Sequence, residues 1–277
     1  MAYHCPTDLT AALQIVAQSG GKVIAGGTDV YPAARQGENP DYYLDVTRIA
    51  GFSDISEGPD GFRFGAATTW RQIAGADLPP AFDALKQAAR AVGGVQIQNA
   101  GTIAGNLSNA SPAADGVPPL LTLEAQVTVA SQERGKRDIP LAKFIMGVRQ
   151  TALAPDELIT SILVPTIPRD ARSAFEKLGS RRYLVISIAM TSALIARDAE
   201  GRITCARVAV GACSPVAQRL PELEWDLIGK RVNEVNVTPR HLSPLSPIDD
   251  ARGSAEYRRD VVSEQCTRAI RRAAGDE

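Results

Sequence analysis

Residues 101–116 read GTIAGNLSNASPAADG, a run of small and hydrogen-bonding residues with almost no large side chain. A buried core element needs bulkier residues, and a surface helix needs charged residues and strong helix formers. A backbone whose side chains are this small can come close to a ligand that carries many hydrogen-bond acceptors. We therefore predict that this segment is a loop that forms one wall of a ligand site.

A second glycine-rich segment lies earlier in the chain and reads KVIAGGTDV over residues 22–30. Its apolar beginning predicts a short strand over residues 22–25, and the glycines after it let backbone N–H groups point at an anion. Thr28 would add a hydroxyl donor. A tight strand-to-helix turn with Asp29 as the N-cap explains the same residues without a ligand. Two such segments in one chain favour a large phosphorylated cofactor that is held from two sides.

The patterns of two common nucleotide sites are missing. The sequence has neither the G-x-G-x-x-G of a Rossmann site nor a Gly-Lys-Ser/Thr after its glycines, which disfavours both a Rossmann fold and a P-loop. In residues 101–116 the amides and hydroxyls could line a pyrophosphate and a heteroaromatic ring, with Asp115 accepting from a ribitol or ribose hydroxyl. An Asx-rich connection whose side chains bond their own backbone is the alternative.

Composition restricts the remaining possibilities. The 277 residues allow two or three subdomains, and a net charge of −1 provides no general attraction to nucleic acid or to an anionic membrane. No apolar run approaches the ~20 residues of a membrane span, and we see no secretory signal, so we expect a cytoplasmic protein. Four scattered cysteines and two histidines disfavour a disulfide scaffold, an iron–sulfur cluster and a histidine metal site on this chain.

The order of the predicted elements changes along the chain. The first part alternates helices with strands, and the part beyond residue 170 has strands followed by helices, which predicts a separate α+β domain. Expected helices cover residues 9–17 (capped by Thr7 or Asp8), a short stretch after Thr69, 81–92, 118–124, 215–229 and 254–272. Expected strands cover residues 22–25, 43–46, 62–66, 126–130, 158–164, 173–178, 186–197 and 203–212.

Five segments, in order along the chain, resemble one family. AGGTD at 25–29 and TIAGNL at 102–107 look like the paired FAD-binding signature of the flavoprotein (medium) subunit of molybdenum hydroxylases, the xanthine dehydrogenase and carbon monoxide dehydrogenase family. The other three segments similar to this family are ELITSI at 157–162 with VP at 164–165, FEK at 175–177 with RR at 181–182, and DARGSAEYRR at 250–259. The sequence departs from the family where Tyr183-Leu184-Val185 follows the arginine pair, because relatives often have an acidic residue there.

The resemblance implies a fold. We expect an α+β protein with a PCMH-type FAD-binding domain over residues 1–170, divided into subdomains of about 1–55 and 56–170. A small C-terminal α+β domain over residues 171–277, an antiparallel sheet with helices, would follow.

The resemblance also implies a cofactor site. One segment would wrap the FAD diphosphate, a second would form the other wall, and two further residues would flank the isoalloxazine. The first segment comprises Lys22, Val23, Ile24, Ala25, Gly26, Gly27, Thr28, Asp29 and Val30. The other residues are Thr102, Gly105, Asn106, Asn109 and Asp115 on the wall, and Ile159 and Lys177 at the ring. A Lys177 cation near the flavin would stabilise the anionic reduced ring, whereas a solvated lysine on an edge strand is the plain alternative.

The implied function is electron transfer within a larger enzyme. The chain would be an oxidoreductase subunit with FAD but with no catalytic residue and no metal ligand of its own. A large molybdopterin-binding subunit and a small subunit with two-iron two-sulfur clusters would be its partners, as a dimer of heterotrimers. The alternatives are a self-contained PCMH-type flavin oxidoreductase and a cofactor-free scaffolding protein. The substrate of the complex and the terminal electron acceptor stay open.

Overall fold

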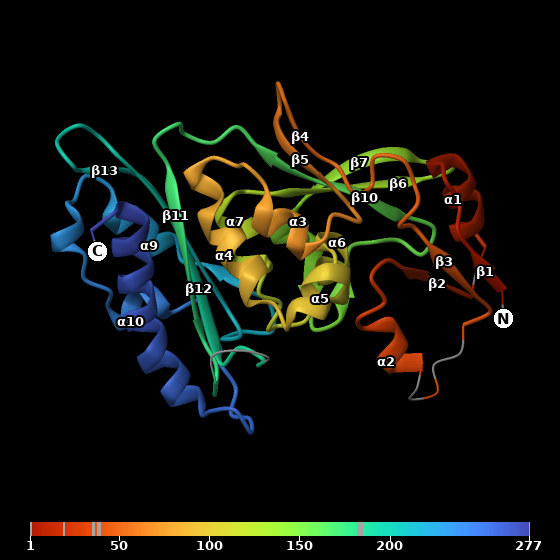
Figure 1. The fold of residues 1–277 in the computed structure, drawn as a ribbon. Helices are drawn as coiled ribbons and strands as arrows, with labels where there is room; N and C mark the ends of the chain where they lie inside the picture. The colour runs from red at the N-terminus through yellow and green to blue at the C-terminus, as the bar shows by residue number, and fades with distance from the viewer. Residues whose placement is uncertain (1, 19, 35–36, 38–39, 182–184, 277) are drawn as a thin grey trace.

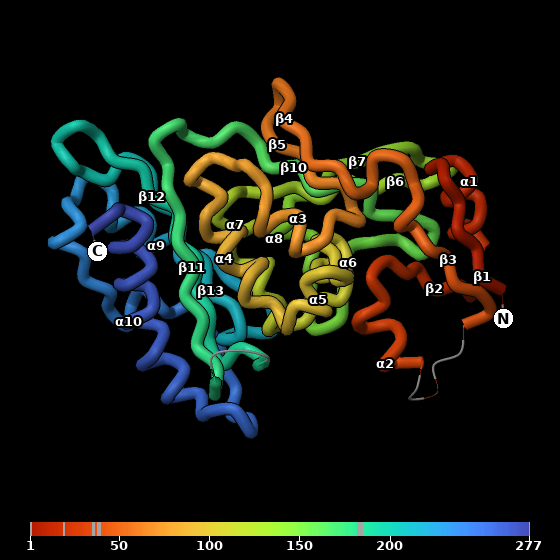
Figure 2. Tube along the Cα trace, in the orientation of Figure 1, coloured from red at the N-terminus to blue at the C-terminus, as the bar shows by residue number. Residues whose placement is uncertain are grey.

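The computed structural model describes residues 2–18, 20–34, 37, 40–181 and 185–276. Among the described residues, three larger sheets follow one another along an elongated molecule (Figure 1), and two short strands form a fourth, two-stranded sheet. The N-terminal strands and the C-terminal helix lie at opposite ends of the molecule (Figure 2). Among the described residues, no helix is both long and apolar enough to cross a membrane.

The N-terminal sheet is small and parallel, with the strand order β1-β3-β2. Its strands are β1 (Ala2–His4), β2 (Gly21–Ile24) and β3 (Tyr42–Asp45), and its helices are α1 (Leu9–Val16) and α2 (Val30–Ala34). Helix α1 begins after Asp8, whose carboxylate accepts a hydrogen bond of 2.9 Å from the backbone N–H of Ala11. This confirms the predicted helix start, because the cap satisfies a donor that the first turn leaves without a partner.

The central sheet is antiparallel, with the strand order β4-β5-β10-β6-β7. Its strands are β4 (Ile55–Gly58), β5 (Gly61–Gly65), β6 (Gln126–Ser131), β7 (Gly135–Pro140) and β10 (Leu158–Pro165). The short elements around it are α3 (Trp70–Gly75), η1 (Pro80–Phe82), α4 (Asp83–Ala91), α5 (Val95–Ala100), α6 (Ile103–Asn109), α7 (Val117–Thr122), α8 (Leu141–Phe144), β8 (Ile145–Gly147) and β9 (Gln150–Thr151). Strand β10 lies in the middle of the sheet and is buried almost throughout.

The C-terminal sheet is also antiparallel, with the order β11-β12-β13-β14. Its elements are β11 (Arg172–Leu178), β12 (Ala189–Arg197), β13 (Ile203–Gly211), β14 (Gln218–Arg219), α9 (Pro221–Leu227), η2 (Val232–Glu234), η3 (Pro239–Leu242) and α10 (Ala255–Ala274). Helix α10 packs against β11 and β12, whereas α4 and α7 of the central part pack against β11, β12 and β13.

Strand β12 has no solvent face because alternate side chains enter two different cores. Ala193 and Ile195 join the cluster formed with α10, and Leu194 and Ala196 join the central core. Successive residues of a strand point to opposite faces, so helices cover both faces of the C-terminal sheet. This double burial explains why most residues of β12 are apolar.

The structure corrects two predicted elements. Residues 103–109 are a helix and not part of a loop, because Thr102 caps the first turn and the large residues Ile103 and Leu107 lie on one buried face. The predicted helix over residues 215–229 is limited to α9, since a proline is accepted at the first helical turn but not in a helix interior. Residues 218–219 pair instead with β13 as an edge strand.

Two strands also differ from the prediction, because the sequence gives no clear signal for where they begin or that they exist. The predicted strand over residues 186–197 begins only at Ala189. Strand β7 was not expected because four of its first five residues are charged or glycine, and only Ile139 among its residues is buried. It is an edge strand, where charged residues are favoured.

Candidate functional site

The two glycine-rich segments lie directly against each other. A Cβ atom built on Gly26 would lie only 1.8 Å from the carbonyl oxygen of Ala100 and 2.9 Å from the backbone nitrogen of Gly101. No side chain fits there, so the first segment rests with bare backbone on the start of the second. Gly27 has a φ of +69°, and a Cβ on it would meet the ring of Tyr31 at 2.3 Å. The structure thus places the two segments in contact, and their role as walls of a cofactor site is still a prediction.

Backbone hydrogen bonds hold the second segment in place. The N–H of Trp70 donates to the carbonyl oxygen of Gly101 at 3.1 Å, and the N–H of Ile103 donates to that of Thr68 at 2.9 Å. Thr102 is 4% exposed and its hydroxyl oxygen accepts from the N–H of Gly105 at 3.1 Å. The Thr102 side chain therefore already serves as the cap of α6.

A cavity of about 320 Å³ opens beyond this helix. Its lining comes from the turn after α4, from α6 and the connection that follows it, and from the segment before β12, as Val92, Gly93, Asn106, Ala113, Asp115, Val185 and Ile186. The Oδ1 atom of Asn106 is buried and has no hydrogen-bond partner among the described residues. A buried acceptor without a partner is costly, so this atom marks a place where a donor from outside the chain would be stabilising.

Asp115 is the charged residue of the cavity wall. It is 6% exposed and accepts from Nζ of Lys177 at 2.5 Å and from Oγ of Ser187 at 2.6 Å. Burial raises the pKa of Asp115, and the Lys177 ammonium and the Ser187 hydroxyl partly counteract this effect by stabilising the carboxylate.

Lys177 is not the solvated lysine of the alternative interpretation. Its side chain is 12% exposed, and its ammonium also donates to the carbonyl oxygen of Ala91 at 3.1 Å. Lys177 lies on β11 and Asp115 before α7, so this pair joins the C-terminal sheet to the central part of the molecule.

The remaining candidate residues occupy varied places. Lys22, Val23 and Ile24 form β2, with Ile24 buried in the sheet, while Val30 begins α2. The turn itself is therefore Ala25–Asp29. Asn109 ends α6 and takes hydrogen bonds from the Arg149 guanidinium through its backbone and side-chain oxygens.

Ile159 lies apart from the cavity lining. Its side chain is 8% exposed and belongs to the central core, at an irregularity in the pairing of β10 with β6.

Ser187 is a functional candidate that the sequence did not single out. The only available signal is a hydroxyl residue within the apolar run VISIA at 185–189, which predicts a strand and says nothing about Asp115. Residues 182–184, where the sequence departs from the family pattern, lie outside the described residues.

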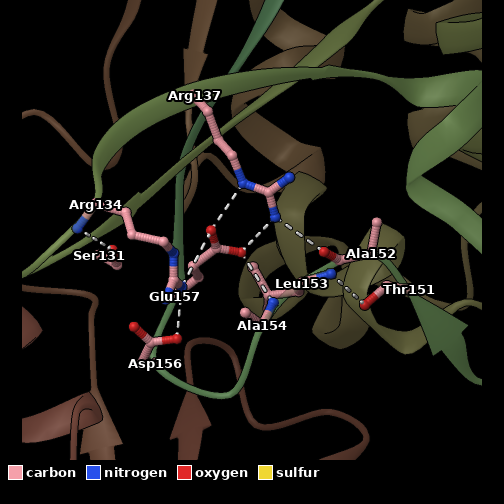
Figure 3. A network of polar contacts seen from close by, with 9 residues as sticks. All are labelled: Ser131, Arg134, Arg137, Thr151, Ala152, Leu153, Ala154, Asp156 and Glu157. Carbon is pink, nitrogen blue, oxygen red and sulfur yellow. Dashed lines mark hydrogen bonds and ion pairs between the residues drawn. The ribbon is translucent and has the colours of Figure 1, made fainter.

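Glu157, in one of the family-like segments, belongs to a polar network away from the cavity (Figure 3). It is 3% exposed and accepts from Nε and Nη2 of Arg137 at 2.8 and 2.7 Å, and from the N–H of Ala154 at 2.9 Å. The Arg137 guanidinium lowers the pKa of Glu157 to about 2. The network ties β7 to the start of β10, so this part of the segment supports the fold.

Comparison with known proteins gives matches along nearly the whole chain. Residues 1–167 match the family described as FAD binding domain in molybdopterin dehydrogenase, and residues 173–273 match the CO dehydrogenase flavoprotein C-terminal domain.

Two curated relatives and one solved structure illustrate these matches. The 6-hydroxypseudooxynicotine dehydrogenase complex subunit alpha of Paenarthrobacter nicotinovorans is 29% identical over 98% of this chain and 93% of its own length. The nicotinate dehydrogenase FAD-subunit of Eubacterium barkeri is 34% identical over 75% of this chain and 71% of its length. The structure of reconstituted CO dehydrogenase from Oligotropha carboxidovorans superposes with a TM-score of 0.91 at 23% identity, covering 100% of this chain and 98% of that one. The predicted fold class is confirmed.

Proposed function

This chain belongs to the FAD-binding subunits of the molybdopterin dehydrogenase family, and we propose that it carries electrons through FAD within a heterotrimeric molybdenum hydroxylase. It is an oxidoreductase subunit, and its cofactor is FAD. In the proposed direction of transfer, electrons arrive from two-iron clusters on a partner subunit and leave to an external acceptor.

The residues present fit a cofactor of this kind. The contact of Gly26 with Ala100 and Gly101 brings the two glycine-rich segments together, and backbone N–H groups of the turn beside this contact would suit a diphosphate. The unpartnered Oδ1 of Asn106 and the carboxylate of Asp115 provide acceptors suited to the hydroxyl or N–H groups of a ribityl chain and ring. The contact between the two glycine-rich segments, together with the unpartnered acceptor at the cavity, carries the proposal.

We assign the proposed contacts by segment. Residues 22–30 would hold the diphosphate, chiefly through the turn at Ala25–Asp29. The opposite wall would consist of Thr102, Gly105, Asn106, Asn109 and Asp115, and the isoalloxazine would be flanked by Ile159 and Lys177. Ile159 has the weakest support because its side chain is packed in the core.

FAD, when bound, supplies two-electron chemistry that accepts reducing equivalents from one partner and delivers them to another. This chain's residues prepare the site for it. The nearly buried ammonium of Lys177 is paired with the lining residue Asp115, and its positive charge would stabilise negative charge on a reduced ring in the cavity. Asp115 and the carbonyl of Ala91 hold the ammonium at that position.

Partners follow from the same proposal. Relatives of this chain are named as the alpha subunit of a complex, a medium subunit and a FAD-subunit. We propose a large molybdopterin-binding subunit and a small iron–sulfur subunit, assembled as a dimer of heterotrimers. Within this chain we place the boundary between the FAD-binding and C-terminal domains near residue 170.

Purification from the native source tests the proposal. We expect a visible spectrum with flavin and iron–sulfur absorbance, and mass spectrometry should find one larger and one smaller polypeptide with the chain. Flavin on a chain that purifies alone and turns over substrate would favour the self-contained oxidoreductase. Absence of flavin even after reconstitution with FAD would contradict the cofactor site.

A further inference from the structure

Arg258, in the first turn of α10, is a buried cation outside the cavity lining. It is 2% exposed, and its Nη1 atom donates to the carbonyl oxygens of Ile188 and, at 2.9 Å, of Ala212. Its Nη2 atom donates to Oδ1 of Asp250 at 2.7 Å. A buried guanidinium is tolerated only where a counter-charge and acceptors surround it. These three contacts supply them at Nη1 and Nη2, while Nε is buried without a hydrogen-bond partner among the described residues.

The carbonyl groups of Ile188 and Ala212 belong to backbone segments that are hydrogen-bonded to residues beside the cavity. Ser187, directly before Ile188, donates its hydroxyl to Asp115. The N–H of Ala212 donates to the carbonyl oxygen of Pro112 at 2.9 Å. One guanidinium therefore holds the backbone at Ile188 and at Ala212, and residues 112–115 are bonded by Ala212 itself and by Ser187, the neighbour of Ile188.

A third connection reaches Lys177. The N–H of Ile188 donates to the carbonyl oxygen of Leu178 at 2.8 Å, and Leu178 follows Lys177 on β11. The backbone held by Arg258 thus contacts both sides of the Asp115–Lys177 pair, although the guanidinium contacts neither member.

We propose that Arg258 is a positioning residue for the cofactor site, which holds Ser187 and residues 112–115 in the arrangement that shapes the cavity. This inference rests on the proposed function, because the effect is exerted on a cavity that takes FAD. The competing interpretation is that Arg258 only stabilises the C-terminal domain. The two interpretations differ in their consequence, since a purely stabilising residue changes the free energy of unfolding but leaves the surroundings of a bound flavin unchanged.

The test compares Arg258→Met with Arg259→Met in the purified complex. Arg259 is the adjacent arginine on α10 and is exposed, so its removal controls for loss of charge on this helix. We expect R258M to raise the dissociation constant of FAD about tenfold or more and to shift the absorption bands and midpoint potential of the bound flavin. R259M should match the wild type, and R258M with wild-type affinity, spectrum and potential would overturn the inference.

A milder pair of variants applies if R258M does not fold. Arg258→Lys keeps a cation but cannot hold two carbonyls and a carboxylate with the geometry of a guanidinium. If Arg258 acts through Ser187, the effects of R258K and Ser187→Ala on FAD affinity should be clearly less than additive in the double variant. Additive effects would overturn the inference.

The wild-type titration separates the two levels of the proposal. Failure of the wild-type complex to bind FAD would overturn the proposed function together with this inference. Binding of FAD by the wild type, with R258M and R258K unchanged, would overturn only the role of Arg258.

Discussion

The two walls of the candidate site are built by opposite means. At the turn Ala25–Asp29 the wall exists because side chains are missing, and Gly26 lies on the backbone of Ala100 and Gly101. At the cavity the wall depends on side chains from widely separated parts of the chain, because Asp115 lines the cavity while Lys177 and Ser187 donate hydrogen bonds to its carboxylate. The first wall is a matter of steric fit within one domain, and the second depends on how the C-terminal sheet packs onto the central part.

The largest expected effect comes from filling the bare wall. Gly26→Val would place a branched side chain onto a backbone carbonyl that cannot move like a flexible side chain, so the two segments must separate and FAD retention should be lost. The flavin-to-protein ratio of the purified variant measures this, with circular dichroism to check folding. Gly75→Ala is the control, because a Cβ at Gly75 meets nothing within 4 Å. Retention of flavin by G26V would show that the first wall has been misassigned.

The charged wall should respond differently. Asp115→Asn leaves the buried Lys177 ammonium without its counter-charge, so we expect the free energy of unfolding to fall by about 3 kcal/mol and the affinity for FAD to fall more than tenfold. The D115N/K177M double variant should recover much of the stability but not the affinity. Denaturant titrations and FAD titrations give the two quantities.

An exposed ion pair on α10 provides the control for this comparison. Glu264 and Arg268 are both more than half exposed, and Glu264→Gln should change neither quantity measurably. An equal loss of stability in E264Q and D115N would show that burial of the Asp115–Lys177 pair is not the cause.

The smallest expected effect lies outside both walls, in the network around Glu157. Its folded-state pKa of about 2 is below the ordinary glutamate value of 4.5, so its stabilising effect is complete above about pH 4.5 and is lost as the pH falls toward 2. Glu157→Gln should lower the free energy of unfolding at neutral pH by about 2 kcal/mol, because Arg137 is half exposed and partly screened. Wild-type and variant stabilities should converge in acid.

Affinity for FAD provides the contrast between this network and the two walls. E157Q at neutral pH should bind FAD like the wild type, since the polar partners of Glu157 are Arg137 of β7, Arg134 just before it and Ala154 before β10, none of which lines the cavity. A large loss of affinity in E157Q would mean that the network also shapes the cofactor site.

The features predicted correctly from the sequence are mostly local. Either Thr7 or Asp8 was expected to cap the first helix and Thr69 the short helix after it. Asp8 and Thr69 accept the hydrogen bonds of a cap, because a cap depends on residues three positions away. The sequence predicted two segments that hold a cofactor from two sides, but it did not predict the direct contact of Gly26 with Ala100. Lys177 was expected at the cofactor through the family resemblance, and that contact with FAD is still a prediction.

The features that were missed depend on packing. Helix α6 has few strong helix formers and is held by Thr102 and by the burial of Ile103 and Leu107, so tertiary contacts override a low propensity. Ser187 and Arg258 act across sequence separations of 72 and 70 residues, to Asp115 and Ile188 respectively. Such contacts leave no periodic signal in a single sequence.

The double burial of β12 has a consequence for protein engineering. Leu194 and Ala196 complete the central core, and Ala193 and Ile195 complete the core under α10. The C-terminal sheet therefore belongs to both hydrophobic cores. Expressing either half alone would expose an apolar face and favour aggregation. Exchange of the C-terminal part between relatives, to build chimaeric dehydrogenase subunits, would therefore have to include the facing residues of α4 and α7 in the same graft.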